Sequence, residues 1–318
     1  MQYPNMHVAT AQSSAAHLPV TPAPAVKTTI QPTKRIYPRS FFYQRGKYWT
    51  NEQVHALNCV SEKNVTPIDL LGKSYPTDEK ILKSNIFDRT AFAKLNEDFI
   101  TPSKQEILDY HYKPHESPIR KNDILTIFLT LSWIHDLDKN CDYVPPTIDS
   151  ILSILGLRMD IFRANFIIDK YSIPYNLAKL NMKGVLLCDG GIFCPDDKWR
   201  QCPLVVLLDT YALSKRQARN NLFSCLLLPM AVKYEQGQKR DPYVSFCITA
   251  NLSKYRVTRA EAPHTYFEDL RQGRRMEDKL VMKGTREYDL LKEEDRDEFL
   301  KVYWGICSFL VKSREEGL

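Results

Sequence analysis

An Asp-Gly-Gly sequence at residues 189–191 is the strongest local constraint on how this chain of 318 residues can fold. Short apolar runs lie on both sides of it, at residues 185–188 and 192–195. An Asp-Gly pair favours the positive φ angles of the tight turns that join antiparallel strands. The sequence therefore predicts that the two runs form a β-hairpin, with Cys188 and Cys194 flanking its turn.

Three helical patterns precede this predicted hairpin. Residues 117–140 have the apolar pattern of a buried helix, residues 144–157 form a second helix, and residues 158–184 form a third that is interrupted before Pro174. Three helices and then a hairpin, over residues 120–195, resemble the winged-helix DNA-binding proteins. This resemblance implies that the hairpin is a wing that lies along the phosphate backbone of DNA.

A second unit of the same kind follows a short apolar segment at residues 202–211. Ser214 is typical of a helix N-cap, and the helix that it opens begins with side chains that contact bases and phosphates. A second hairpin with a basic tip is predicted over residues 231–250, and it would follow the DNA backbone while the helix enters the major groove. The alternative is a helix with a solvated polar end and a plain hairpin. The candidate nucleic-acid-binding residues of this unit are Lys215, Arg216, Gln217, Arg219, Asn220, Lys239 and Arg240.

The whole net charge of +6 lies in residues 1–48, which contain six basic residues and no Asp or Glu. We expect residues 1–33 to be disordered, because they show no apolar period. Residues 34–48 interleave basic and aromatic side chains. This pattern suits an arm that neutralises phosphates and stacks on bases, or alternatively a linker whose aromatic residues pack on the following domain. The candidate binding residues of the arm are Lys34, Arg35, Arg39, Arg45 and Lys47.

Further helices are predicted on both sides of these units. Residues 49–87 read as three short helices with Thr50, Thr66 and Thr77 as N-caps. Their pattern favours an ordinary helical subdomain. Their spacing also resembles the trihelical units of Myb-like and homeodomain-like proteins, which is the alternative. At the other end of the chain, residues 286–316 form an amphipathic helix. It packs on its own domain or, alternatively, joins two copies of the chain in a homodimer.

These patterns together predict a mainly α fold with short β-hairpins, of the α+β kind. The fold would contain one or two winged-helix-like units plus a small trihelical segment. The predicted domains are a disordered basic arm (1–48), a small trihelical segment (49–100), a first winged-helix-like unit (101–200), and a second winged-helix-like unit with the C-terminal amphipathic helix (201–318).

Two patterns are typical of metal chemistry. Cys188, Cys194 and Cys202 offer three thiolates, but structural zinc sites have more closely spaced pairs and a fourth ligand. His135 and Asp136 resemble the pair that binds a divalent ion in HD-type metal-dependent phosphohydrolases, and a simple helix end is the alternative. The sequence contains no glycine-rich phosphate-binding loop. We therefore expect no cofactor and no metal.

We accordingly expect a DNA-binding protein without catalysis, which acts on double-stranded DNA as a transcription regulator or a plasmid- or phage-type replication initiator. A protein-interaction module with a basic tail, such as an effector or virion component, is the first alternative, and the HD-type phosphohydrolase is the second. No apolar run reaches the roughly 18 residues that span a bilayer, so we expect no membrane partner. Scattered cysteines and the lack of an export-signal pattern predict an intracellular protein, cytoplasmic or, in a eukaryote, nuclear.

Overall fold

The computed structural model divides the chain into two units, Met1–Lys34 and Arg35–Leu318, and the elements described below belong to the second. The structure describes residues 37, 42, 48–76, 95–112, 127–128, 131, 151–153, 155, 167–169, 172–193, 203–211 and 213–315. Predictions that fall on other residues, including the helix expected to begin after Thr77, lie outside the described residues.

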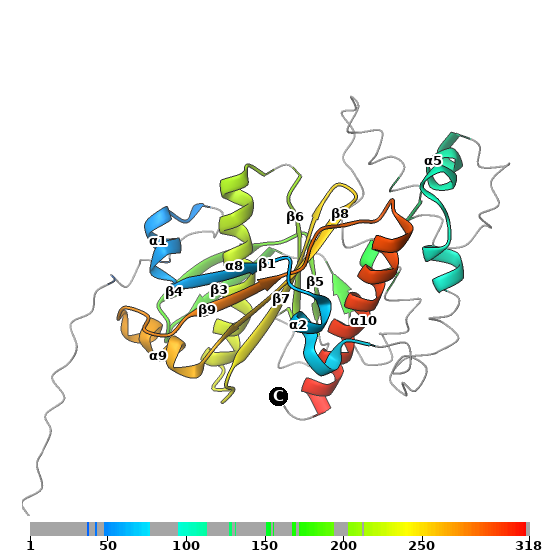
Figure 1. Cartoon of the computed structure of the whole chain (residues 1–318). Helices are drawn as coiled ribbons and strands as arrows, with labels where there is room; N and C mark the ends of the chain where they lie inside the picture. The colour runs from blue at the N-terminus through cyan, green and yellow to red at the C-terminus, as the bar shows by residue number, and fades with distance from the viewer. Residues whose placement is uncertain are drawn as a thin grey trace, which may run out of the picture. The chain divides into compact units, whose positions relative to one another are not determined.

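A mixed β-sheet forms the centre of the described fold (Figure 1). In spatial order its strands are β1 (Cys59–Lys63), β9 (Leu280–Gly284), β8 (Lys254–Ala262), β7 (Tyr243–Asn251), β6 (Val205–Asp209), β5 (Gly190–Phe193) and β2 (Ile167–Asp169). Strand β1 pairs parallel with β9, and β6 pairs parallel with β7, whereas the other neighbours are antiparallel. The short strand β10 (Tyr288–Asp289) also pairs antiparallel with β8.

Helices pack on both faces of this sheet. Val206 and Leu208 of β6 point into the same apolar cluster as helices α8 (Lys215–Glu235) and α9 (His264–Gln272). Val205 and Leu207 point into the opposite cluster, which contains helix α10 (Glu293–Glu315). The fold is therefore α/β, and the prediction of a mainly α protein with short hairpins is wrong. Of the apolar runs that suggested helices and wings, residues 167–169, 190–193 and 243–251 are strands of this sheet, and residues 172–177 and 182–187 form a separate two-stranded sheet.

The first predicted hairpin does not form. Strand β4 (Met182–Leu187) pairs with β3 (Ser172–Leu177) in a separate two-stranded sheet, while β5 pairs with β6 and β2. Strands β2 and β3 lie inside residues 158–184, which were predicted to be helical. Gly191 is required by close packing rather than by a turn, since a Cβ atom there would lie 3.0 Å from Pro203 Cβ.

The second predicted hairpin is also wrong, because residues 231–234 continue helix α8. Pro229 lies inside this helix and lacks the amide that would bond to the carbonyl of Cys225. The buried Ser245 hydroxyl of β7 donates to the neighbouring carbonyl of Leu226 at 2.6 Å. This bond ties α8 to β7 within the turn that precedes Pro229. Strand β7 pairs instead with β6 and β8.

Several helix starts and helical segments agree with their predictions. Thr50 caps α1 (Asn51–Ala56), and Thr66 caps α2 (Pro67–Leu71), which is followed by the short helix η2 (Gly72–Ser74). Helix α1 ends earlier than predicted, because Asn58 adopts a positive φ of 46° and the chain enters β1. The described parts of the predicted helices 117–140 and 144–157 are helical, and their apolar side chains are buried.

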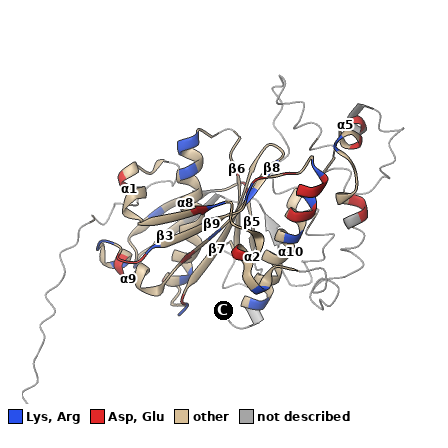
Figure 2. Ribbon diagram, viewed as in Figure 1, with Lys and Arg blue, Asp and Glu red and all other residues tan. Residues whose placement is uncertain are grey.

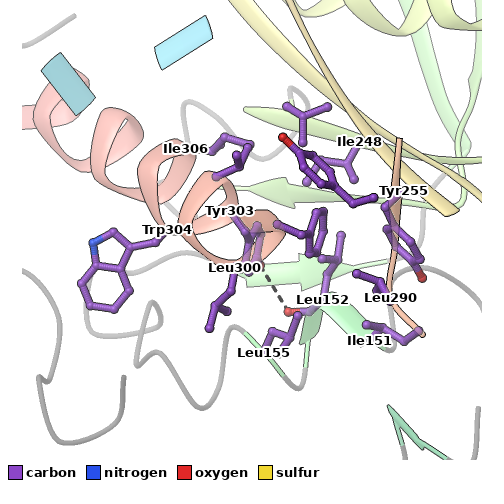
Figure 3. Close-up of a cluster of buried hydrophobic side chains, with 14 of the residues drawn as sticks. Ile151, Leu152, Leu155, Ile248, Tyr255, Leu290, Leu300, Tyr303, Trp304 and Ile306 are labelled. Atoms are coloured by element: carbon purple, nitrogen blue, oxygen red, sulfur yellow. Dashed lines mark hydrogen bonds between the residues drawn. The ribbon is translucent and has the colours of Figure 1, made fainter. Parts of the chain in front are cut away.

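The C-terminal helix packs on its own domain, as predicted, although it begins at Glu293. Figure 3 shows Leu300 and Tyr303 of α10 next to buried side chains of other segments, and the Tyr303 hydroxyl donates to the carbonyl of Leu152 at 3.2 Å. The apolar face that a homodimer through this helix would use is therefore buried within the chain.

Arg296 joins α10 to the segment that contains the helical turn η3 (Asn96–Ile100) and precedes helix α5 (Lys104–Tyr112). The side chain is fully buried, and its guanidinium donates to the carbonyls of Phe99 at 2.8 Å, Ile100 at 2.7 Å and Leu290 at 3.0 Å, and also to that of Pro102. Burial lowers the pKa of Arg296 to about 10. One planar group thus satisfies four carbonyls that no other side chain could reach together.

We expect Arg296→Met to reduce the free energy of unfolding by about 3 kcal/mol or more, because buried carbonyls lose their donors. Urea denaturation of the full chain measures this loss. Arg256→Met is the control, since Arg256 is partly exposed and lies 3.9 Å from Glu287, and it should cost less than about 1 kcal/mol. Equal denaturation midpoints for the two variants would show that the buried bonds of Arg296 are not important for stability.

Candidate nucleic-acid interface

The first turn of α8 carries an exposed cluster of basic residues, seen as blue segments at the end of this helix that follows β6 (Figure 2). Lys215, Arg216 and Arg219 are exposed. Arg219 donates to Asn51 Oδ1 at 3.2 Å. Within the described part of the chain, no hydrogen bond or ion pair engages the side chain of Lys215 or Arg216. We call Lys215, Arg216 and Arg219 the α8 basic cluster.

Two other predicted contact residues of this helix have structural roles. Gln217 forms a capping box with Ser214, in which the Ser214 hydroxyl accepts from the Gln217 amide at 3.3 Å and Gln217 Oε1 accepts from the Ser214 amide at 3.1 Å. Asn220 is fully buried and donates to the carbonyl of Trp49 at 2.8 Å. Asn220 therefore fixes α8 to the start of α1, and its predicted contact with nucleic acid is wrong.

Lys239 and Arg240 do not share a surface with the α8 basic cluster. They follow the C-terminal end of α8, a helix of 21 residues, so about 30 Å of helix separates them from Lys215. The predicted arrangement, in which a helix start and a basic hairpin tip lie on one side of the molecule, is therefore wrong. It depended on ending the helix near Pro229.

The basic arm is described only in part. Its five candidate binding residues, Lys34, Arg35, Arg39, Arg45 and Lys47, lie outside the described residues. Phe42 is buried, bridges to Met182 of β4, and packs against Trp49 with ring centroids 5.3 Å apart. Tyr37 donates its amide to the carbonyl of Gly273 at 3.1 Å. For Phe42, the alternative interpretation of aromatic side chains packed on the following domain is confirmed.

The carboxyl end of β6 lies next to the α8 basic cluster and was not identified from the sequence. Asp209 ends this strand, its amide donates to Asp189 Oδ2 at 2.6 Å, and its own Oδ1 accepts from the amide of Tyr211 at 2.9 Å. Burial raises the pKa of Asp209. The available signal was an apolar run that ends in polar residues and leads into a capped helix, since ligands of open α/β sheets bind beyond the carboxyl ends of strands.

A second polar cluster lies at the opposite end of α8. Tyr234 and Arg271 both donate to Glu268, Arg271 at 2.5 Å, and His264 Nε2 lies 3.6 Å from the same carboxylate. Tyr243 donates to the carbonyl of Gln238, and its hydroxyl lies 3.1 Å from His264 Nδ1. Burial opposes ionisation of Glu268, but the bonds from Tyr234 and Arg271 outweigh it and lower the pKa of this carboxyl. The cluster joins the end of α8 to the start of α9.

Most arginines of residues 253–275 are engaged by acidic neighbours. Arg259 lies 2.9 Å from Glu261, Arg271 lies 2.5 Å from Glu268, and Arg274 lies 2.6 Å from Asp269, while Arg256 is 3.9 Å from Glu287. These pairs reduce the positive charge that the four arginines would otherwise add at β8 and near α9.

The predicted metal patterns are described only at Cys188. Cys194, Cys202, His135 and Asp136 lie outside the described residues, and the described residues contain no group of three or more His, Cys, Asp or Glu that could hold a metal ion. Burial raises the pKa of the Cys188 thiol to about 12, which disfavours the thiolate that zinc would need.

Comparison with models of known protein families gives no match, and comparison with curated proteins gives no related protein. Within the described part of the chain, every helix is too short or too polar to cross a membrane.

We expect Glu268→Gln to reduce the free energy of unfolding by about 1 kcal/mol at pH 7. A carboxyl whose pKa is lower in the folded than in the unfolded chain stabilises the fold above its ordinary pKa of 4.5, and this contribution is lost as the pH falls through the lowered value. The difference in free energy of unfolding between the variant and the original chain should therefore become smaller as the pH falls below 4.5. Denaturant midpoints measured across this range provide the test.

Glu277→Gln is the control for this measurement, because Glu277 is exposed and lies outside the cluster. It should change the midpoint little at any pH. A difference for Glu268→Gln that stays constant from neutral to acidic pH would contradict the proposed role of its charge.

Proposed function

We propose that this protein binds nucleic acid through the α8 basic cluster, without catalysis. The residues carried over from the sequence prediction to this surface are Lys215, Arg216 and Arg219. The exposed position of their side chains supports contact with phosphates, for which Lys and Arg are the usual partners.

The single observation that carries this proposal is the sign of the charge at the start of α8. The first turn of α8 begins with Lys215 and Arg216 and contains no acidic residue. A helix N-terminus has a partial positive charge, so cations there disfavour the helix while an anion is attracted. The helix dipole and the three exposed cations both favour a polyanion at this position.

The expected roles in transcription regulation or replication initiation, with double-stranded DNA as the ligand, are part of this proposal. An intracellular location is also part of this proposal, and the free thiols of the described cysteines Cys59, Cys247 and Cys307 support it.

A protein-interaction module is the second candidate function. The observation that favours it is the pairing of Arg256, Arg259, Arg271 and Arg274 with acidic residues, which limits the basic surface to a small area. A surface of that size suits an acidic segment of a partner protein as well as a short stretch of nucleic acid.

The test compares two variants of the full chain. Each variant replaces one Lys and one Arg, either at the start of α8 or just beyond its C-terminal end. We expect Lys215→Gln with Arg216→Gln to weaken binding to labelled oligonucleotides. Each lost phosphate contact should reduce the slope of log affinity against log salt concentration by about 0.7 to 0.9. Fluorescence anisotropy at several salt concentrations measures both effects.

Lys239→Gln with Arg240→Gln is the matched control, because it removes one Lys and one Arg from the other end of the helix. It should leave the salt slope nearly unchanged. Equal losses of oligonucleotide affinity in both variants would contradict a localised interface. An unchanged affinity in Lys215→Gln with Arg216→Gln would show that α8 is not part of the binding surface.

A further inference from the structure

Two exposed aromatic side chains flank the α8 basic cluster. Among the described residues, the exposed large apolar side chains are Tyr48 (54%), Val60 (36%), Ile68 (60%) and Tyr211 (46%). The two aromatic members of this group, Tyr48 and Tyr211, are the ones that lie beside α8. Exposed tyrosines next to cations are a combination that nucleic-acid-binding surfaces use repeatedly.

Local contacts fix the backbone that carries each tyrosine. Tyr211 lies four residues before Lys215, in the turn between β6 and α8, where its amide donates to Asp209 Oδ1 at 2.9 Å. Tyr48 directly precedes Trp49, a fully buried residue whose carbonyl accepts from Asn220 Nδ2 at 2.8 Å. A preordered backbone lowers the entropy lost when an exposed ring binds a ligand.

The same contacts place both tyrosines next to the basic side chains. Arg219 donates to Asn51, three residues after Tyr48, so the start of α1 lies against the second turn of α8. Figure 1 shows α1 beside the upper part of α8. The surface therefore has Lys215 and Arg216 at the helix start, Tyr211 before them in the chain, and Tyr48 three residues before Asn51, the partner of Arg219.

We propose that this surface binds single-stranded nucleic acid, with bases stacked on Tyr48 and Tyr211 and phosphates paired with the α8 basic cluster. This inference rests on the nucleic-acid binding proposed above for the α8 basic cluster, and it replaces double-stranded DNA with an unpaired strand as the ligand. In a duplex the faces of the bases are covered by their neighbours, so exposed tyrosine rings gain little from it. An unpaired strand offers both free base faces and phosphates, and aromatic stacking accepts any base.

The experiment measures binding of the full chain to oligothymidylate, to oligouridylate and to a duplex, each of about 16 nucleotides in length. We expect the original chain to bind both single strands more tightly than the duplex. Tyr48→Ala with Tyr211→Ala should weaken single-strand binding by about tenfold for each ring and leave the duplex affinity nearly unchanged. Tyr48→Phe with Tyr211→Phe should restore single-strand binding, because phenylalanine also stacks.

Ile68→Ala controls for the loss of an exposed apolar side chain away from this surface and should change no affinity. Unchanged single-strand binding in the double alanine variant, or a duplex that binds as tightly as the single strands, would overturn the inference but leave the proposed function intact. Loss of all binding in Lys215→Gln with Arg216→Gln supports the proposed function, whereas retention of binding in that variant contradicts it together with this inference.

Discussion

Burial of the central strands on both faces is the constraint on which the rest of this structure depends. Alternate residues of β6 face opposite apolar clusters, and Phe246 and Cys247 of β7 do the same. Such strands need apolar elements on both sides, and the parallel pair formed by β6 and β7 also needs a crossover connection. Helix α8 supplies that crossover, so its N-terminus must follow the carboxyl end of β6 and its C-terminus must precede β7. The crossover thus explains why Lys215, at the start of α8, and Lys239, beyond its C-terminal end, lie far apart.

Local signals in the sequence predicted helix starts well and strand pairing poorly. The caps at Thr50, Thr66 and Ser214 depend on atoms only three residues away, and the structure contains all three. Pairing depends on partners far along the chain, so the Asp-Gly-Gly sequence was misinterpreted as a turn. The turn between β7 and β8 instead contains Leu252, with a positive φ of 58°, a residue type that gives no turn signal. Short apolar runs at residues 167–177 fitted a helix as well as strands.

The candidate site was predicted in part for the same reason. Lys215, Arg216 and Arg219 follow a recognisable cap, so their place at the exposed start of a helix could be read from the sequence. The burial of Asn220 could not be predicted from the sequence, because it depends on a contact with Trp49, which is 171 positions earlier in the chain. The position of Arg240 depended on whether α8 ends at Pro229, and in the structure this helix continues to Glu235. Tertiary contacts, rather than residue type, therefore determined which predicted side chains face outward together.

The described helices differ in the sign of the charged residues in their first turns, and this difference supports a function for α8. Helices α1, α2, α5 and α10 each have an acidic residue in the first turn, the arrangement that the helix dipole favours. At α10 this acidic start is further matched inside the chain, since Arg286 pairs with Asp295 and Glu298. Helix α8 begins with cations, which oppose its dipole by about 0.3 to 1 kcal/mol each, and only its capping box offsets that cost. Helix α9 also lacks an acidic residue in its first turn, but among the described helices only α8 places two fixed positive charges there. These charges lie beside the carboxyl end of β6, where a bound phosphate backbone would neutralise them.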